Sequence, residues 1–200
     1  MDRQEYEQVK SLNYPEYCNY LKKKYGQPKF PYYTRDWKKS RGNSKTSEGL
    51  FIHHVFEDHA IRLSDEMYAS INPYEWQLPE NLVYCDFLEH LLLHILICEN
   101  PSPDHNRIEA PGIGGVRNFI VPELNDAYSG YRPKLAWKQC CYNKVIKDKD
   151  VYFELVRRFK HGCSNLPLYS EEKLYRSFNE QYGQWSVEKD EEIITELKKL

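Results

Sequence analysis

The stretch from Asp86 to Cys98 constrains the fold more than any other part of the chain. Asp86 is a typical N-cap residue and Glu89 follows three positions later, the capping-box pattern that marks the start of a helix. The apolar residues that follow predict a helix to about Cys98. His90 and His94 are four positions apart, so they share one face of that helix and are spaced to bind a single metal ion. The apolar neighbours would anchor the helix while the histidines face a cleft.

Two short β-prone runs precede this helix. Residues 49–52 are apolar and end at His53 and His54, and a second run covers residues 82–84. The polar stretch between them, 55–80, holds one expected helical turn at 64–70. A histidine at the end of a strand is a natural third ligand beside His90 and His94. Three neutral imidazoles with an open fourth position describe a catalytic metal site rather than a closed structural one.

The flanking regions are expected to be mostly helical. Residues 4–25 predict one helix with a stop at Gly26, and 27–48 predict a loop. Residues 100–115 carry the turn signals of another loop. Further helices are expected over 122–128, 135–146, 150–161 and from 186 onward. These elements predict an α+β chain with three segments: an N-terminal helix and basic arm (1–47), a small core of two strands and a helix with a candidate metal site (48–98) and a loop followed by a helical C-terminal region (99–200).

Composition excludes a membrane-spanning chain. No apolar run reaches the roughly 18 residues that cross a bilayer, and the first ten residues are charged rather than apolar. The chain is therefore expected to be cytoplasmic. The 6 cysteines include no CxxC pair, which favours reduced thiols that serve as packing residues.

Charge is distributed unevenly along the chain, although the net charge is only −2. Residues 1–50 carry 11 Lys and Arg against 6 Asp and Glu, a balance of +5, whereas residues 51–100 carry 1 against 9, a balance of −8. An acidic, histidine-rich segment beside a basic one suits a cation site next to a phosphate-binding surface. Solvated charge scattered by chance explains the same balance equally well.

The basic arm carries the candidate contacts to nucleic acid, which are Lys38, Lys39, Arg41 and Lys45. Aromatic residues are interleaved with these cations. Cations bind the phosphate backbone and aromatic faces stack on exposed bases, so the mixture favours nucleic acid as a partner. A plain surface loop is the alternative.

The order and spacing of five residues resemble the HNH (ββα-metal) nuclease family, especially its colicin-type branch. That pattern has a His-His pair closing the first strand, an Asn opening the second, a His nine residues later and another His after four more. Here the five residues are His53, His54, Asn81, His90 and His94. The resemblance covers about residues 48–98, and it implies an insertion over 58–80, because 28 positions separate His53 from Asn81.

The resemblance implies a role for each residue. His53, His90 and His94 would bind one divalent metal ion, His54 would be the general base, and Asn81 would brace the loop that orients His54. Imidazole ligands favour Zn²⁺ or another transition metal, while Mg²⁺ and Mn²⁺ are also compatible with the family. The predicted function is metal-dependent endonucleolytic hydrolysis of nucleic acid, with DNA as the favoured substrate.

The rival hypothesis is a zinc-stabilised module that binds nucleic acid or another protein without catalysis. Cys98 follows His94 by four positions, so the two residues could join His90 and His53 in a closed tetrahedral site.

Overall fold

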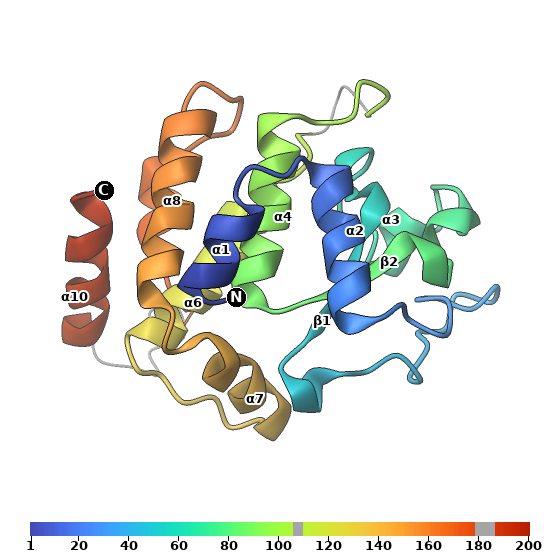
Figure 1. Ribbon diagram of the computed structural model, residues 1–200, viewed down its shortest axis with the longest axis horizontal. Coiled ribbons are helices and arrows are strands. Elements are labelled where there is room, and N and C mark those ends of the chain that lie inside the picture. The colour runs from blue at the N-terminus through green and yellow to red at the C-terminus, as the bar shows by residue number, and fades with distance from the viewer. Residues whose placement is uncertain (106–109, 179–186) are drawn as a thin grey trace.

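Helix α4 (Phe87–Glu99) forms the centre of the molecule (Figure 1). The computed structural model describes residues 1–105, 110–178 and 187–200. The expected capping box is confirmed, because the Asp86 side chain accepts from the Glu89 amide and the Glu89 side chain accepts from the Asp86 amide. Every residue from Phe87 to Cys98 is buried except His90. A helix that is apolar on all sides needs neighbours on all sides.

Helices and one small sheet surround α4. The α-helices are α1 (Arg3–Val9), α2 (Tyr14–Tyr25), α3 (Glu66–Ala69), α5 (Ile113–Gly115), α6 (Val121–Tyr128), α7 (Ala136–Val145), α8 (Lys149–Cys163) and α10 (Val187–Lys198). Short 3-10 helices are η1 (Thr46–Glu48), η2 (Val55–Asp58), η3 (Tyr74–Gln77), η4 (Pro79–Asn81) and η6 (Glu171–Tyr175), and η5 (Val116–Ile120) is a π-helix. Helix α8 packs along one side of α4 and α2 along another (Figure 1).

The sheet consists of β1 (Phe51–His54) and β2 (Leu82–Cys85), paired antiparallel. His53 lies opposite Val83 and His54 opposite Leu82. Both strands fall where the β-prone runs predicted them. The chain is therefore mixed, mostly helical with a two-stranded sheet, which is compatible with an α+β class. Strand β2 leads directly into α4 through Asp86, and its last residue, Cys85, lies opposite Phe51 at the start of β1. His90 and His94, in the following turns of α4, lie beside His53 of β1.

The N-terminal prediction of one helix over 4–25 is wrong, because the structure has two. Asn13 starts α2 with its own capping box to Glu16, and Pro15 occupies the first turn. Proline cannot continue a helix from the preceding turn but is well suited to a first turn, so the chain ends α1 and restarts. The expected stop at Gly26 is confirmed, and its φ of 76° is readily adopted by glycine.

The loop predicted over 100–115 is too long, because helical structure begins at Ile113 and continues through η5 into α6. The start is packed tightly on α4. A Cβ on Gly112, whose φ is +82°, would lie 2.7 Å from the His94 carbonyl oxygen and 2.8 Å from Cys98 Sγ. Close packing on α4, rather than local propensity, thus favours this glycine-rich helical turn. Residues 106–109 of the predicted loop and residue 186 of the predicted terminal helix lie outside the described residues.

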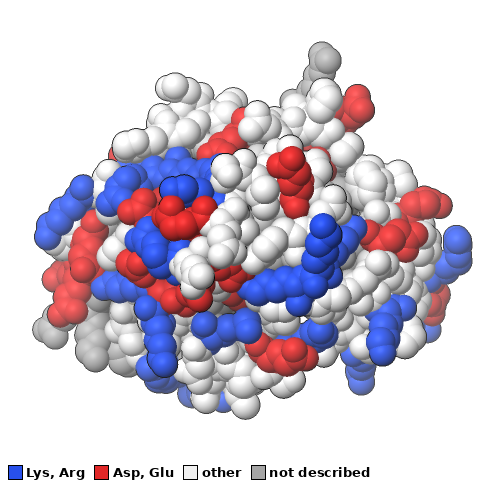
Figure 2. Space-filling model, in the orientation of Figure 1, with Lys and Arg blue, Asp and Glu red and all other residues white. Residues whose placement is uncertain are grey.

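Surface charge is mixed on the face drawn in Figure 2, where basic and acidic side chains are intermingled. Among the described residues no helix is both long and apolar enough to cross a bilayer. All six cysteines are free thiols, and all but Cys140 are buried.

Candidate metal centre

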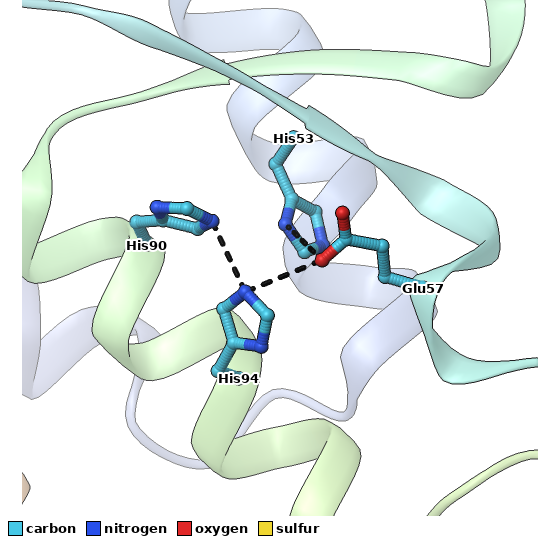
Figure 3. A group of neighbouring side chains, drawn as sticks. All are labelled: His53, Glu57, His90 and His94. Carbon is cyan, nitrogen blue, oxygen red and sulfur yellow. Dashed lines mark hydrogen bonds and ion pairs between the residues drawn. The ribbon is translucent and has the colours of Figure 1, made fainter. Parts of the chain in front are cut away.

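Four side chains converge beside α4: His53 from the end of β1, Glu57 from η2, and His90 and His94 from α4 (Figure 3). One ligand atom from each lies within 4.8 Å of all the others. The His90 and His94 Nε2 atoms are 3.1 Å apart, and Glu57 Oε2 lies 3.3 Å from His94 Nε2 and 3.6 Å from His53 Nδ1. The three histidines predicted as ligands are thus brought together, and the group could hold one metal ion.

The spacing of these atoms fits a metal ion. In a tetrahedral zinc site with bonds of roughly 2.0–2.1 Å, the ligand atoms lie about 3.3 Å from one another. The three separations of 3.1, 3.3 and 3.6 Å bracket that value. Three imidazole nitrogens and a carboxylate oxygen at such distances leave little room between them for hydrogens, so a cation at the centre would satisfy all four.

Burial sets the protonation of the group. It holds the pKa of His53 and His90 well below the usual histidine range, and it lowers the pKa of His94 to about 4. The imidazoles are therefore neutral near pH 7, the form that binds metals. Burial also raises the pKa of Glu57 to about 8, and the described side chains that approach this carboxyl are neutral histidines. A bound divalent cation would keep Glu57 ionised and so allow it to act as a ligand.

Tyr14 determines which nitrogen of His53 is free. Its hydroxyl donates to the Val55 carbonyl at 2.8 Å and lies 2.9 Å from His53 Nε2. A hydroxyl has one proton to donate, so it must accept from Nε2–H of His53. His53 Nδ1 then carries the lone pair, points at Glu57, and is buried with no hydrogen-bond partner among the described residues. This is the arrangement that a metal-ligating histidine needs.

We expect Tyr14→Phe to weaken divalent-metal binding by roughly 10- to 100-fold, the usual effect of removing a group that orients a ligating histidine. Tyr17→Phe is the matched control, because Tyr17 is equally buried but its hydroxyl contacts Met1 Sδ instead. Calorimetric titration with Zn²⁺ and Mn²⁺ measures both. Equal metal affinities for the two variants would show that the Tyr14 hydroxyl does not orient His53 for metal binding.

The His94 ring packs directly on α5. A Cβ on Gly115 would lie 2.4 Å from both Cε1 and Nδ1 of that ring, closer than real atoms approach. The neighbouring Gly114 is open, since its Cβ would meet only Asn118 Nδ2 at 3.9 Å. Gly115 therefore forms a cradle that fixes the orientation of His94.

We expect Gly115→Ala to displace the His94 ring and to lower metal affinity by about 10- to 100-fold, as loss of ligand orientation does elsewhere. Gly114→Ala makes the same chemical change one residue away and should leave the affinity unchanged, with stability raised by about 0.4–1 kcal/mol. Metal titration and thermal melting of both variants test this. A Gly115→Ala protein that binds metal with wild-type affinity would show that the His94 ring can accommodate the added methyl group without losing its orientation.

His54, the predicted general base, lies beside the group but is not one of its four members. It is fully buried, packs edge-on against Tyr32, and its Nε2 is 3.1 Å from Gln77 Oε1. The Gln77 amide nitrogen donates to the Leu63 carbonyl, so its oxygen faces His54 and accepts from Nε2–H. His54 Nδ1 thus keeps its lone pair, has no hydrogen-bond partner in the part of the chain that the structure describes, and lies 3.9 Å from Glu57 Oε1.

Asn81 does not join the group. Its side-chain amide donates to the Glu75 carbonyl at 2.8 Å, across the turn formed by η3 and η4. That turn carries Gln77, which contacts His54. The contact closes the loop next to His54, and the bracing role of Asn81 stays a prediction.

The sequence did not predict Glu57 as a member of the group, because a carboxylate in a polar loop is typically exposed surface charge. The available signal was its place four residues after His53. Its neighbour Asp58 contacts His59 instead, and Glu89 binds Lys24. Cys98, the fourth ligand of the rival tetrahedron, is not part of the group, and its Sγ contacts the Pro111 carbonyl.

The cations of the basic arm are not members of this group. Lys38 pairs with Asp36, Lys39 lies over the Tyr32 ring, and Lys45 donates to the Tyr25 carbonyl. Neither these three nor Arg41 lines the cleft that opens onto the group. Their contact with nucleic acid stays a prediction.

A cleft of about 950 Å³ opens onto the group. Glu57, His90 and His94 line it, whereas His53 and His54 lie behind the wall. Residues between 110 and 120, among them Arg117 and the exposed Phe119, also line this cleft. The candidate metal centre is thus accessible to a molecule much larger than water.

No family model, curated protein or solved structure matches this chain. The likeness to HNH nucleases therefore rests on the five residues and their spacing.

Proposed function

We propose that the chain is a metal-dependent hydrolase of nucleic-acid phosphodiester bonds with an HNH-like ββα-metal site, and that DNA is its substrate. The observation that carries the proposal is a three-histidine, one-carboxylate group that faces a large cleft. Four protein ligands would complete a tetrahedral zinc site, so the phosphate would have to enter from the cleft as a fifth ligand. A purely structural site has no need of such access. The order of β1, β2 and α4 and the spacing of Asn81, His90 and His94 agree with the family pattern.

His53, His90, His94 and Glu57 would hold one divalent ion. Imidazoles favour Zn²⁺ or another transition metal, and the Glu57 oxygen also suits Mn²⁺ or Mg²⁺. When bound, such an ion neutralises the charge that develops on a phosphate and its leaving oxygen.

His54 would take the proton from the attacking water at Nδ1. Two features of the chain support this role: the hydrogen bond from Nε2–H to Gln77, which leaves Nδ1 as an acceptor, and the position of Nδ1 next to Glu57. Burial lowers the pKa of His54 to about 4, so the imidazole is neutral near pH 7 and would accept a proton from a water made more acidic by a bound ion.

Hydrolysis of supercoiled plasmid and of a labelled RNA with added Zn²⁺, Mn²⁺, Mg²⁺ or Ni²⁺ tests the proposal. We expect nicking of DNA that chelator abolishes. A protein that binds metal but cuts neither substrate would instead be the metal-stabilised binding module, and its folding would then depend on the metal.

A further inference from the structure

A second pocket, of about 510 Å³, adjoins the cleft of the metal centre. Arg117 and Asn118 line both, so these two residues form the wall between them. Lys173 and Arg176 complete the charged lining of the second pocket, which contains no carboxylate among the described residues. We call Arg117, Lys173 and Arg176 the cationic pocket.

The charge of the cationic pocket is not neutralised locally. Lys173 and Arg176 form no ion pair within the described parts of the chain. The adjacent carboxylate of Glu171 is engaged by Lys160 at 2.8 Å, and Asp190 is buried where it accepts from Ser177. Three cations around one concavity repel one another, and an anion bound among them would remove that repulsion.

Arg117 is held in place at the shared wall. One guanidinium nitrogen donates to the Leu168 carbonyl, and Nε is buried without a hydrogen-bond partner within residues 1–105, 110–178 and 187–200. Arg117 belongs to the π-helix η5, a conformation found often at functional sites. Phe119, two residues on, is 56% exposed and lines the cleft, where its ring offers a face on which a base can stack.

We propose that the cationic pocket binds a backbone phosphate of the same nucleic-acid strand whose reacting phosphate lies at the metal centre. This inference rests on the proposed function. Two anion-binding positions joined through Arg117 fit a polymer of phosphodiesters better than a single small phosphate ester. Arg and Lys contacts to phosphate give affinity and register without reading sequence.

The test is the affinity for a short labelled DNA duplex at several NaCl concentrations, measured in chelator so that hydrolysis plays no part. Lys173→Ala with Arg176→Ala is compared with Arg132→Ala with Lys134→Ala, two exposed cations outside both pockets. Arg117 is left intact because it holds the Leu168 carbonyl. We expect the first variant to bind more weakly and its log–log salt dependence to flatten by about 0.9 per lost contact, and the control to keep the wild-type slope.

Equal losses in both variants, or an unchanged slope in the first, would overturn the inference. Calorimetry with inorganic phosphate separates a small-anion site from a nucleic-acid site. Phosphate binding that disappears in the first variant while its DNA affinity stays at the wild-type level would also overturn it. Binding is measured without metal, so a protein that never cleaves DNA can still show the expected change in salt dependence. The binding assay therefore tests the cationic pocket, and the cleavage assay tests the proposed function, independently of each other.

Discussion

Replacing His90 and His94 together with alanine is expected to abolish divalent-metal binding and any hydrolysis that depends on it. The two Nε2 atoms are 3.1 Å apart on one face of α4, so the change removes two of the four ligand side chains. Metal added at a hundred times its dissociation constant stabilises the wild type by about 2.7 kcal/mol, and the variant should lose this gain entirely. Calorimetry and thermal melting with and without metal measure both effects.

The control for this variant is His59→Ala with His105→Ala, which removes two histidines outside the group. His59 contacts Asp58 and Ser102, and His105 contacts the Ser102 carbonyl. The control should keep one metal ion per chain and the metal-dependent rise in melting temperature. Metal affinity that survives loss of His90 and His94 would place the binding site elsewhere in the chain.

His54→Ala is expected to lower DNA cleavage by roughly 10²- to 10⁴-fold, the usual cost of removing a general base, while one metal ion stays bound. The reason is geometric: His54 keeps Nδ1 as a free acceptor beside Glu57, yet it is not in the group of ligands. His53→Ala should instead lose metal and cleavage together. Metal content, melting temperature and plasmid cleavage of both variants distinguish the two roles.

Because His54 is buried, the activity of the His54→Ala variant distinguishes proton transfer by His54 from proton transfer by another group. Because His54 lies behind the cleft wall, an attacking water must reach Nδ1 past Glu57. An active His54→Ala protein would assign the proton transfer to another group, with Glu57 the first candidate. The proposed hydrolase would survive that result, whereas the role of His54 would not.

Local sequence signals predict those parts of the site whose structure is determined by residues close together in the sequence. The capping box of Asp86 and Glu89 placed the start of α4, and helical periodicity then placed His90 and His94 on one face. The run of residues 49–52 placed β1, and with it His53 at the strand end. In each case the determining contacts span only a few residues.

Contacts between distant segments could not be predicted in this way. Tyr14 reaches His53 across 39 positions, and Gly115 packs on His94 across a turn whose helical form depends on α4. Glu57 enters the group because η2 turns back toward α4 immediately after β1. No periodicity or spacing rule describes such a turn. The break between α1 and α2 was missed for another reason, since the capping signal at Asn13 is local but was outweighed by the apolar pattern on both sides.

The measurement that tests the metal centre most directly is an anomalous difference map from crystals loaded with Zn²⁺ or Mn²⁺. The predicted result is one peak about 2.0–2.2 Å from His53 Nδ1, His90 Nε2, His94 Nε2 and a Glu57 oxygen. The Tyr14 hydroxyl should then lie on the far side of the His53 ring. A map with no peak among these side chains, or a peak bound by Cys98, would contradict the metal centre and the hydrolase proposed from it.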